Sequence, residues 1–470
     1  MYFYFFYLLC TYGIAPTITS AFQQKNYLQL NTLTRRTPFQ SLMPSTSRIL
    51  HNSKIRYEST FFQTNLFNND ERNRCKSSLY NSFHDQDQGI PTSSVTVGIA
   101  GAGAASYATA ALLAIRGHDP MIWSPSGESA PPVVKNVSLS KKYSEVSASG
   151  AIETIFHPRI AFDAKELAFE NEVIILALPA NGHMKVMQLL APHLKRHHTV
   201  IISSHSSLGA IYLTKLIQEQ QQERGQDANE NWRLPIVAWG TTVATARRTS
   251  ASSVQVCTLR TLVDMCTIPY DHSEHGLSVC QNLFGRRRFQ QRDGLLAITL
   301  SNLNAQNHLG IVLGNMSRID RNEKWSQGLN ITPSIGRFLE ALDKERLAIA
   351  STLGLEVRTI FDHFSLSFQV PKNLSVSDMN QCMVEKGNDV NGPASTETRY
   401  VTEDVPYGLT TIVSLGKLVG QPAFLHESGI RIVSAMYGRD FGAENSLLQS
   451  LDLEMVSLEQ LKQAGKTGIL

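Results

Sequence analysis

Short runs of β-branched and aliphatic residues alternate with helical patterns from about Val95 onward. Glycine, proline and polar residues bound these runs, as is usual for strands. The predicted strands cover residues 95–100, 121–123, 173–178, 200–203 and 234–239. Between them, apolar residues recur at helical spacing over residues 104–116, 182–194 and 208–220. This alternation predicts an α/β domain, a parallel sheet with crossover helices, over about residues 95–300.

After about Leu300 the strand patterns fade, and helical patterns predict an all-α domain over residues 301–470. The clearest helix covers residues 335–353, with apolar residues along one side. Its charged residues are expected to form the outer, solvated side; they are Glu340, Asp343, Lys344, Glu345 and Arg346. The polar stretch 373–398 is rich in turn-forming residues and predicts a mobile loop, and the polar stretch 225–232 predicts an excursion loop.

The first 94 residues have a different character. Residues 1–22 resemble a signal-peptide leader, because an aromatic and aliphatic run ends in small residues. Residues 23–94 resemble a disordered transit segment, since no acidic residue precedes Glu58 there. Together they resemble the bipartite plastid-targeting presequences of algae, with a plain secretory signal or a mitochondrial presequence as alternatives. This extension is expected not to contribute to the fold.

Composition limits the class of partner. A chain of 470 residues predicts at least two domains. A formal net charge of +3 gives no field that would indicate nucleic-acid or membrane-surface binding, so small-molecule partners are expected. The six cysteines lie far apart without CxxC pairs, which predicts reduced, mostly buried thiols and no metal site. No apolar run after the leader reaches the ~18 residues of a membrane helix.

The first predicted strand runs directly into Gly101-Ala102-Gly103-Ala104-Ala105-Ser106, which opens a helix. This order is typical of a Rossmann dinucleotide-binding turn. Gly101 would permit the turn, Gly103 would let the backbone approach a pyrophosphate, and Ser106 is small enough for close helix–strand packing. A glycine-rich turn without a ligand is the alternative.

The end of the second predicted strand bears on the choice of nicotinamide cofactor. An acidic residue there would hold the ribose 2′-hydroxyl of NAD, but the chain has Ser124. A hydroxyl does not repel a 2′-phosphate, so NADP is slightly favoured over NAD, although no arginine lies nearby. Residues 177–180 end another strand, either at the edge where ligands bind in such sheets or simply as its terminator.

Three stretches of the C-terminal half, residues 301–308, 339–350 and 399–409, resemble the helical domain of the octopine and nopaline (opine) dehydrogenase family. The most specific is Arg-Tyr-x-x-Glu-Asp-x-Pro-Tyr-Gly-Leu, and the resemblance covers about residues 95–453. It implies an enzyme that reductively condenses an amino acid with an α-keto acid, or runs the reverse oxidation, with NADH or NADPH. By motif, His308 would be the catalytic histidine, Asp404 its paired carboxylate, and Arg399 the residue that binds a substrate carboxylate.

The chemistry of such a reaction agrees with these residue types. Reduction of a carbonyl or imine needs a proton donor with a pKa near neutrality, which a histidine beside a carboxylate supplies. A guanidinium binds carboxylates through two parallel hydrogen bonds. In the alternative interpretations, His308 is an ordinary core or surface histidine, Asp404 starts a turn or caps a helix, and Arg399 forms a surface ion pair. Arg286-Arg287-Arg288 is read as a solvated face rather than a phosphate site.

Two other functions fit parts of the sequence. One is a reductase of a single 2-keto acid or a polyol phosphate, but such enzymes usually rely on a lysine, and neither motif around His308 and Arg399 contains one. The other is a non-enzymatic NAD(P)H-binding sensor. It would need the glycine turn but not the predicted catalytic residues.

Overall fold

The computed structural model describes residues 93–127, 134–135, 142–143, 145–225, 232–285 and 289–470. The predicted leader, nearly all of the transit-like segment, most of the predicted excursion loop and Arg286-Arg287-Arg288 lie outside these residues. The targeting interpretation therefore stays a prediction.

A ten-stranded sheet forms the α/β part, in the order β14-β13-β10-β9-β8-β1-β2-β7-β4-β3. The five predicted strands are its contiguous parallel centre. They are β1 (Thr96–Ala100), β2 (Asp119–Trp123), β8 (Val173–Leu176), β9 (Thr199–Ile202) and β10 (Ile236–Trp239). Nearly every residue in them is buried, which is why they read as continuous apolar runs. The predicted α/β fold is confirmed.

The sequence did not predict the outer strands or the second sheet. The outer strands are β7 (Arg159–Ala161), β4 (Lys142–Tyr143), β3 (Val134–Lys135), β13 (Val263–Ile268) and β14 (Phe289–Gln291). The second sheet has the order β11-β12-β5-β6, from β11 (Ala244–Ser250), β12 (Ser253–Leu259), β5 (Val146–Gly150) and β6 (Thr154–Phe156). Most of these strands are short or largely polar, so pairing with neighbours rather than apolar periodicity stabilises them.

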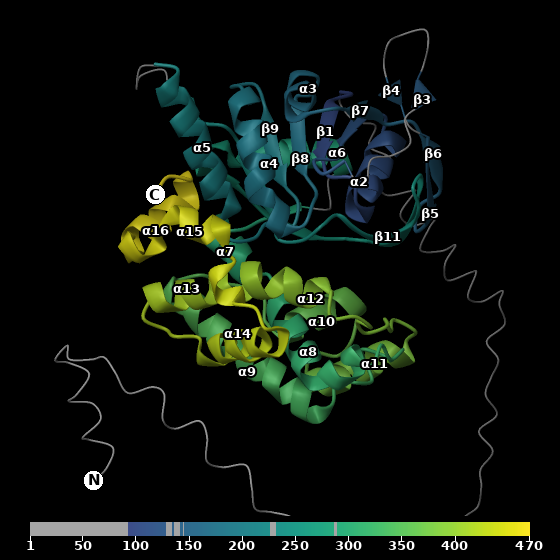
Figure 1. Ribbon diagram of the computed structural model, residues 1–470, viewed down its shortest axis with the longest axis vertical. Coiled ribbons are helices and arrows are strands. Elements are labelled where there is room, and N and C mark those ends of the chain that lie inside the picture. The colour runs from purple at the N-terminus through teal and green to yellow at the C-terminus, as the bar shows by residue number, and fades with distance from the viewer. Residues whose placement is uncertain (1–92, 128–133, 136–141, 144, 226–231, 286–288) are drawn as a thin grey trace, which may run out of the picture. The chain divides into compact units, whose positions relative to one another are not determined.

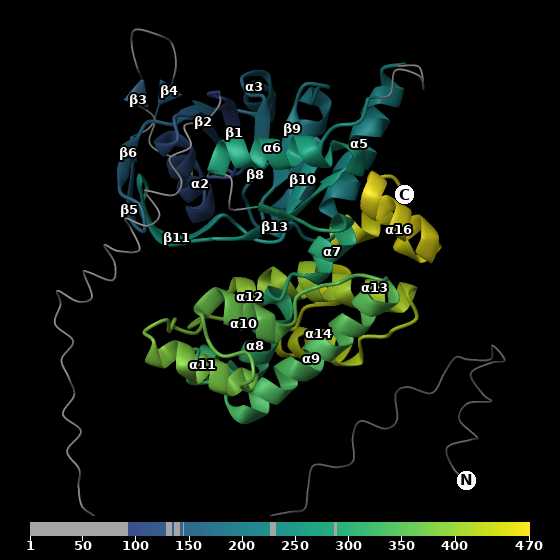
Figure 2. The ribbon, with the colours of Figure 1, turned by 180° about the vertical axis from the view of Figure 1, so that it is seen from behind.

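Helices cover both faces of the large sheet. α3 (Ala164–Phe169), α4 (His183–Leu190) and α5 (Gly209–Glu223) lie on the face seen in Figure 1. α2 (Ala104–Ile115) and α6 (Ser273–Phe284) lie on the face seen in Figure 2. Three short 3-10 turns, η1 (Ala180–Gly182), η2 (Ala191–His193) and η4 (Tyr270–His272), complete the connections. The core under α3, α4 and α5 continues into the helical domain, whereas the core under α2 and α6 also holds the β11–β12 ribbon.

The chain from α7 onward is helical, as predicted. Its α-helices are α7 (Gly294–Leu300), α8 (Asn304–Asp320), α9 (Pro333–Thr352), α10 (Ile360–Phe368), α11 (Val376–Glu385), α12 (Arg399–Thr402), α13 (Thr410–Leu418), α14 (Phe424–Tyr437), α15 (Ser446–Leu451) and α16 (Leu458–Thr467). A π-helical turn η5 (Asp404–Leu409) and 3-10 turns η6 (Phe441–Ala443) and η7 (Leu453–Met455) lie among them. α15 contacts α5, and α16 contacts α7 and β13, so the C-terminal residues pack against the α/β domain. No helix among the described residues is long and apolar enough to cross a membrane.

The prediction of a mobile loop over residues 373–398 is wrong for its first half, which α11 occupies, whereas residues 386–398 form no helix or strand. The Ser375 side chain caps this helix by accepting from the Asp378 backbone N–H. Val376 and Met379 are fully buried. Because most residues of the stretch are polar, its sequence pattern did not indicate a ten-residue helix that buries one face.

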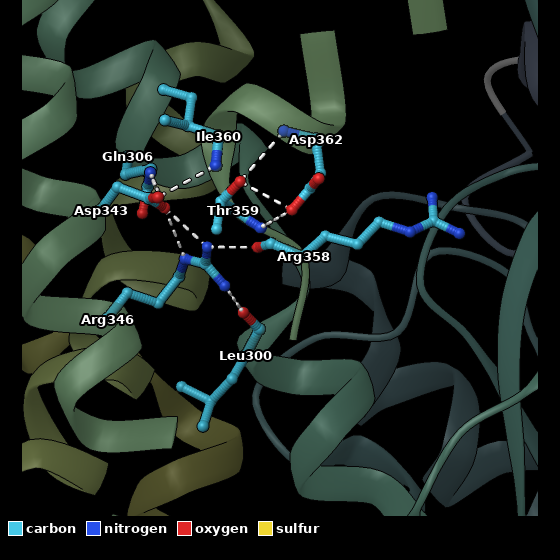
Figure 3. Close-up of polar contacts among 8 residues, drawn as sticks. All are labelled: Leu300, Gln306, Asp343, Arg346, Arg358, Thr359, Ile360 and Asp362. Carbon is cyan, nitrogen blue, oxygen red and sulfur yellow. Dashed lines mark hydrogen bonds and ion pairs between the residues drawn. The ribbon is translucent and has the colours of Figure 1, made fainter. Parts of the chain in front are cut away.

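The prediction of a solvated charged face on α9 is also wrong. Arg346 and Asp343 are buried and paired, with Arg346 Nη2 2.6 Å from Asp343 Oδ1. Figure 3 shows the other hydrogen bonds that these two side chains form. The guanidinium also donates to the carbonyls of Leu300 and, at 2.6 Å, Arg358. Asp343 accepts from the backbone N–H of Ile360 at 2.9 Å and from Gln306 Nε2 at 3.0 Å.

Two further carboxylates of α9 bind backbone groups of other helices. Glu340 accepts from the N–H of Val376 at 3.0 Å, and Glu345 accepts from the N–H of Leu425 at 2.8 Å. Lys344 is the one exposed member of the five charged residues. Helical periodicity located this helix, but it could not show that other helices surround it on several sides.

Replacing Asp343 with Ala should lower the free energy of unfolding by about 3–5 kcal/mol, because Arg346 would stay buried without its counter-ion. The shift of the urea unfolding midpoint, followed by circular dichroism, measures the loss. Lys344→Ala in the next position is the matched control and should change stability by no more than about 0.5 kcal/mol. Equal, small shifts in both variants would contradict the structural role of the pair.

Candidate functional site

The glycine turn lies between β1 and α2, at the point where the sheet order reverses from β1–β2 to β1–β8. Gly101 has a φ of +132°, and a Cβ there would lie 2.3 Å from the carbonyl oxygen of Ala177. Only glycine fits this position. Gly103 is exposed, and a Cβ there would meet no atom within 4 Å. The two glycines thus have the predicted surroundings, one in a tight turn and one facing open space.

The first turn of α2 suits a phosphate. Gly103 provides no side-chain cap, and the first turn has no acidic residue. Its backbone N–H groups therefore point out of the helix end with the positive end of the dipole. Ser106 is fully buried and donates from Oγ to the carbonyl of Ala177 at 2.7 Å. This bond ties α2 to the end of β8. These residues fit a dinucleotide pyrophosphate.

Arg248 of β11 was not predicted as part of this region. Its Nη1 donates to the carbonyl of Ala102 at 2.8 Å, and its guanidinium lies 4.5 Å from the centroid of the Tyr107 ring. The β11–β12 ribbon is therefore attached to the glycine turn. No local pattern in the sequence indicates this contact, which joins residues 146 positions apart.

Ser124 directly follows β2 and is partly buried. Its carbonyl accepts from the N–H of Gly127 at 3.1 Å, which closes a turn at the end of the strand. Gly101 N–H donates to the carbonyl of Trp123 at 2.8 Å. Ser124 therefore lies at the same edge of the sheet as the glycine turn.

His308 and Asp404 lie in contact. His308 is on α8, Asp404 opens η5, and the Nδ1–Oδ2 distance is 2.6 Å across 96 residues of sequence. Each side chain is 18% exposed, so the pair is accessible but largely removed from water. A carboxylate bonded to Nδ1 fixes the ring and leaves Nε2 for proton exchange. π-helical turns such as η5 are frequent at functional sites.

Tyr400 is the neighbour of this pair that the sequence analysis did not single out. Its ring stacks on His308 with centroids 3.5 Å apart and planes 7° from parallel. Its hydroxyl donates to Gln327 Oε1 at 2.9 Å. Burial and the charge of Asp404 raise the pKa of Tyr400, so the phenol stays neutral. Tyr400 belongs to the same Arg-Tyr-x-x-Glu-Asp string as Arg399 and Asp404. Its place in that string could have indicated that it lies near the histidine.

Arg399 opens α12, and its side chain is 69% exposed. Both Nε and Nη2 lie 2.5 Å from Glu403 Oε2. The other oxygen of Glu403 accepts from the N–H of Ala180 at 3.0 Å, just past the end of β8. The structure therefore pairs Arg399 with Glu403 rather than directly with His308 or Asp404. It also joins α12 to residues 177–180, the strand end that the sequence analysis marked as a ligand edge.

The turn after β9 touches the same region. Ser204, Ser207 and Leu208 have positive φ values of 59°, 52° and 55°. Such conformations are uncommon for residues other than glycine and persist only where the surroundings hold them. Ser206 and Ser207 donate from Oγ to the carbonyl of Tyr407 in η5, at 2.9 and 2.7 Å. The turn carrying Asp404 is thus bonded to the α/β domain.

The chain resembles one family of known proteins. Residues 291–437 match the family model "NAD/NADP octopine/nopaline dehydrogenase, alpha-helical domain". Among curated proteins, an opine dehydrogenase from Arthrobacter sp. (strain 1C) is 22% identical over 373 residues, 79% of this chain and 99% of that protein.

Solved structures show the same fold. An octopine dehydrogenase in complex with NADH and agmatine aligns with a TM-score of 0.63 at 15% identity, covering 79% of this chain and 98% of that one. Complexes with NADH and either L-arginine or pyruvate give 0.62, at 14% and 16% identity with the same coverage. A yersinopine dehydrogenase bound to NADP+ gives 0.53 at 13% identity, covering 76% and 98%. The predicted resemblance and the predicted enzyme class, an NAD(P)-dependent oxidoreductase, are confirmed.

Proposed function

Because the chain is related to the opine dehydrogenases, we propose that it reductively condenses an amino acid with an α-keto acid, or catalyses the reverse oxidation. The observation that carries the proposal is the contact between His308 and Asp404. These two residues come from two different family-like motifs, in separate helical segments. A nicotinamide cofactor would supply the hydride when bound.

His308 is the proton donor in this reaction. Condensation of an amine with a keto acid releases water, and reduction of the resulting imine puts hydride on carbon and a proton on nitrogen. Both stages need an acid near neutral pH. Asp404 accepts from Nδ1, so Nε2 is the nitrogen that exchanges protons with the substrate. Tyr400 holds the ring plane from one side.

Arg399 binds a substrate carboxylate. Its side chain is exposed, and Glu403 holds the guanidinium through one oxygen. The remaining N–H groups of the planar fork suit a carboxylate. Since Glu403 is also bonded to Ala180 at the end of β8, the arginine is tied to the edge of the sheet where a nicotinamide would lie.

The proposed function is tested by incubating the purified protein with NADH or NADPH and keto acids and amino acids, singly and in pairs. The keto acids would include glyoxylate, pyruvate and 2-oxoglutarate. We expect loss of absorbance at 340 nm only when both partners are present. Oxidation of the cofactor by a keto acid alone would favour a simple keto-acid reductase, and no oxidation in any mixture would contradict an enzymatic role of this type.

NADP is the cofactor we propose, because Ser124 puts a hydroxyl rather than a carboxylate at the end of β2. Replacing Ser124 with Asp should weaken NADPH binding by repelling the 2′-phosphate and shift preference toward NADH. Fluorescence titration gives both dissociation constants. Binding of NADH at least tenfold tighter than NADPH by the unaltered protein would refute the proposal.

Replacing His308 with Ala should lower turnover by a factor on the order of 10² to 10⁴, through loss of general-acid assistance. Asp404→Asn should lose a similar factor. The double variant should lose little more, because residues that act as a unit are not additive. NADPH affinity should stay nearly unchanged in all three, since the phosphates would bind at the glycine turn. Full activity of His308→Ala, or losses that multiply in the double variant, would end this assignment.

A further inference from the structure

The β11–β12 ribbon is rich in positive charge. Between Thr241 and Val263 the sequence has three arginines and no acidic residue. Arg248 is used in the contact with the glycine turn. For Arg247 and Arg260, no side-chain hydrogen bond or ion pair is formed within the described part of the chain. The nearest acid along the sequence, Asp264, already binds both Arg292 and Arg358 at 3.0 and 2.9 Å.

The ribbon has two different faces. Residues directly opposite each other in an antiparallel pair share a face. Arg248 lies opposite Val254, and Ala246 lies opposite Val256; both valines are buried in the core that contains α2. Arg247 lies opposite Gln255, and both are exposed. Arg247 therefore projects away from α2, on the opposite side from the contact with the glycine turn.

The β11–β12 ribbon runs along the edge of the α/β domain that faces the helical domain, on the side where α10 and α12 lie (Figures 1 and 2). The positive charge of Arg247 works against the burial that raises the pKa of Tyr400, the residue stacked on His308. Arg260, from the end of the same ribbon, has a buried Nε without a hydrogen-bond partner among the described residues. Burial, together with the charges of Arg260, Arg358 and Arg346, lowers the pKa of His363 in α10 to about 4. The charges of Arg260 and Arg247 thus reach residues of α10 and α12, and no acidic residue in the described part of the chain pairs with either arginine.

A second carboxylate site follows from the chemistry of the proposed reaction. Joining an amino acid to a keto acid gives a secondary amine with a carboxylate on each side of the nitrogen. The Arg399 guanidinium is already held by Glu403, and the N–H groups that remain suit one further carboxylate. His308 and Asp404 are only 18% exposed, so a second carboxylate beside them would be partly dehydrated. We propose that Arg247 binds the second carboxylate. This inference rests on the proposed function for its substrate class.

The proposal is tested with two probes that differ by one carboxylate. Iminodiacetate is a secondary amine with two carboxylates, and N-methylglycine is one with a single carboxylate. Titration calorimetry with protein saturated with NADPH measures binding without turnover of either amine. The unaltered protein should bind iminodiacetate at least tenfold more tightly, since a bidentate guanidinium–carboxylate contact is among the stronger hydrogen-bonded pairs.

Arg247→Ala should remove most of this preference and leave the affinity for N-methylglycine nearly unchanged. Arg247→Lys should keep part of the preference, because it retains the charge but not the planar fork. Arg431→Ala, a change at an exposed arginine on α14, is the matched control and should keep the full preference. The NADPH affinity of Arg247→Ala should equal that of the unaltered protein. This measurement checks that the substitution has not disturbed the contact of the neighbouring Arg248 with the glycine turn.

A preference for iminodiacetate that survives in Arg247→Ala would overturn the proposal, as would unaltered protein that does not distinguish the probes. These outcomes are separate from failure of the proposed function. If the protein turns over an amino acid and a keto acid together, but Arg247→Ala keeps the preference, only the second carboxylate site is contradicted. Loss of the preference in Arg247→Ala without paired turnover supports the site and removes the proposed reaction.

Discussion

The buried pair of Asp343 and Arg346 holds together the part of the helical domain from which the candidate site is built. An isolated charge in this position would be very costly, but the two side chains neutralise each other and are also bonded to four other segments of the chain. The guanidinium fixes the end of α7 and the loop before α10, and the carboxylate fixes the start of α10 and, through Gln306, the first turn of α8. His308 lies two residues beyond Gln306. The orientation of the proposed proton donor is therefore connected to a satisfied polar network in the core.

The two domains meet through short polar contacts close to the site. Glu403 joins Arg399 to the N–H of Ala180, the serines after β9 donate to the carbonyl of Tyr407, and Arg358 reaches Asp264 on β13. Each contact joins a strand end or neighbouring turn of the α/β domain to α12, η5 or the loop before α10. Since ligands in such sheets bind at the carboxyl ends of the strands, these contacts set where the proton donor lies relative to a bound cofactor. The cationic β11–β12 ribbon, which Arg248 attaches to the glycine turn, lies along the edge of the α/β domain that faces the helical domain.

Much of the architecture could be predicted because strong local sequence patterns indicate its elements. The buried parallel strands read as apolar runs, and the glycine turn followed one of them. The prediction failed where a residue's role depended on distant partners. The charged residues of α9 have the spacing of a solvated helix, yet Asp343 and Arg346 are buried because they neutralise each other. The stretch 373–398 looked like a loop because its polar residues outnumber the few apolar residues that α11 buries.

The sequence by itself determined the α/β and helical division, the turn at Gly101 and Gly103, and the family-like strings containing His308, Arg399 and Asp404. These features depend on residue type and spacing within one segment. Only the tertiary structure decided that His308 Nδ1 meets Asp404 across 96 residues, that Tyr400 stacks on the imidazole, and that Glu403 pairs with Arg399. It also decided which face of the β11–β12 ribbon Arg247 occupies. Such contacts depend on how separate elements pack, and side-chain spacing along one element does not encode the position of another.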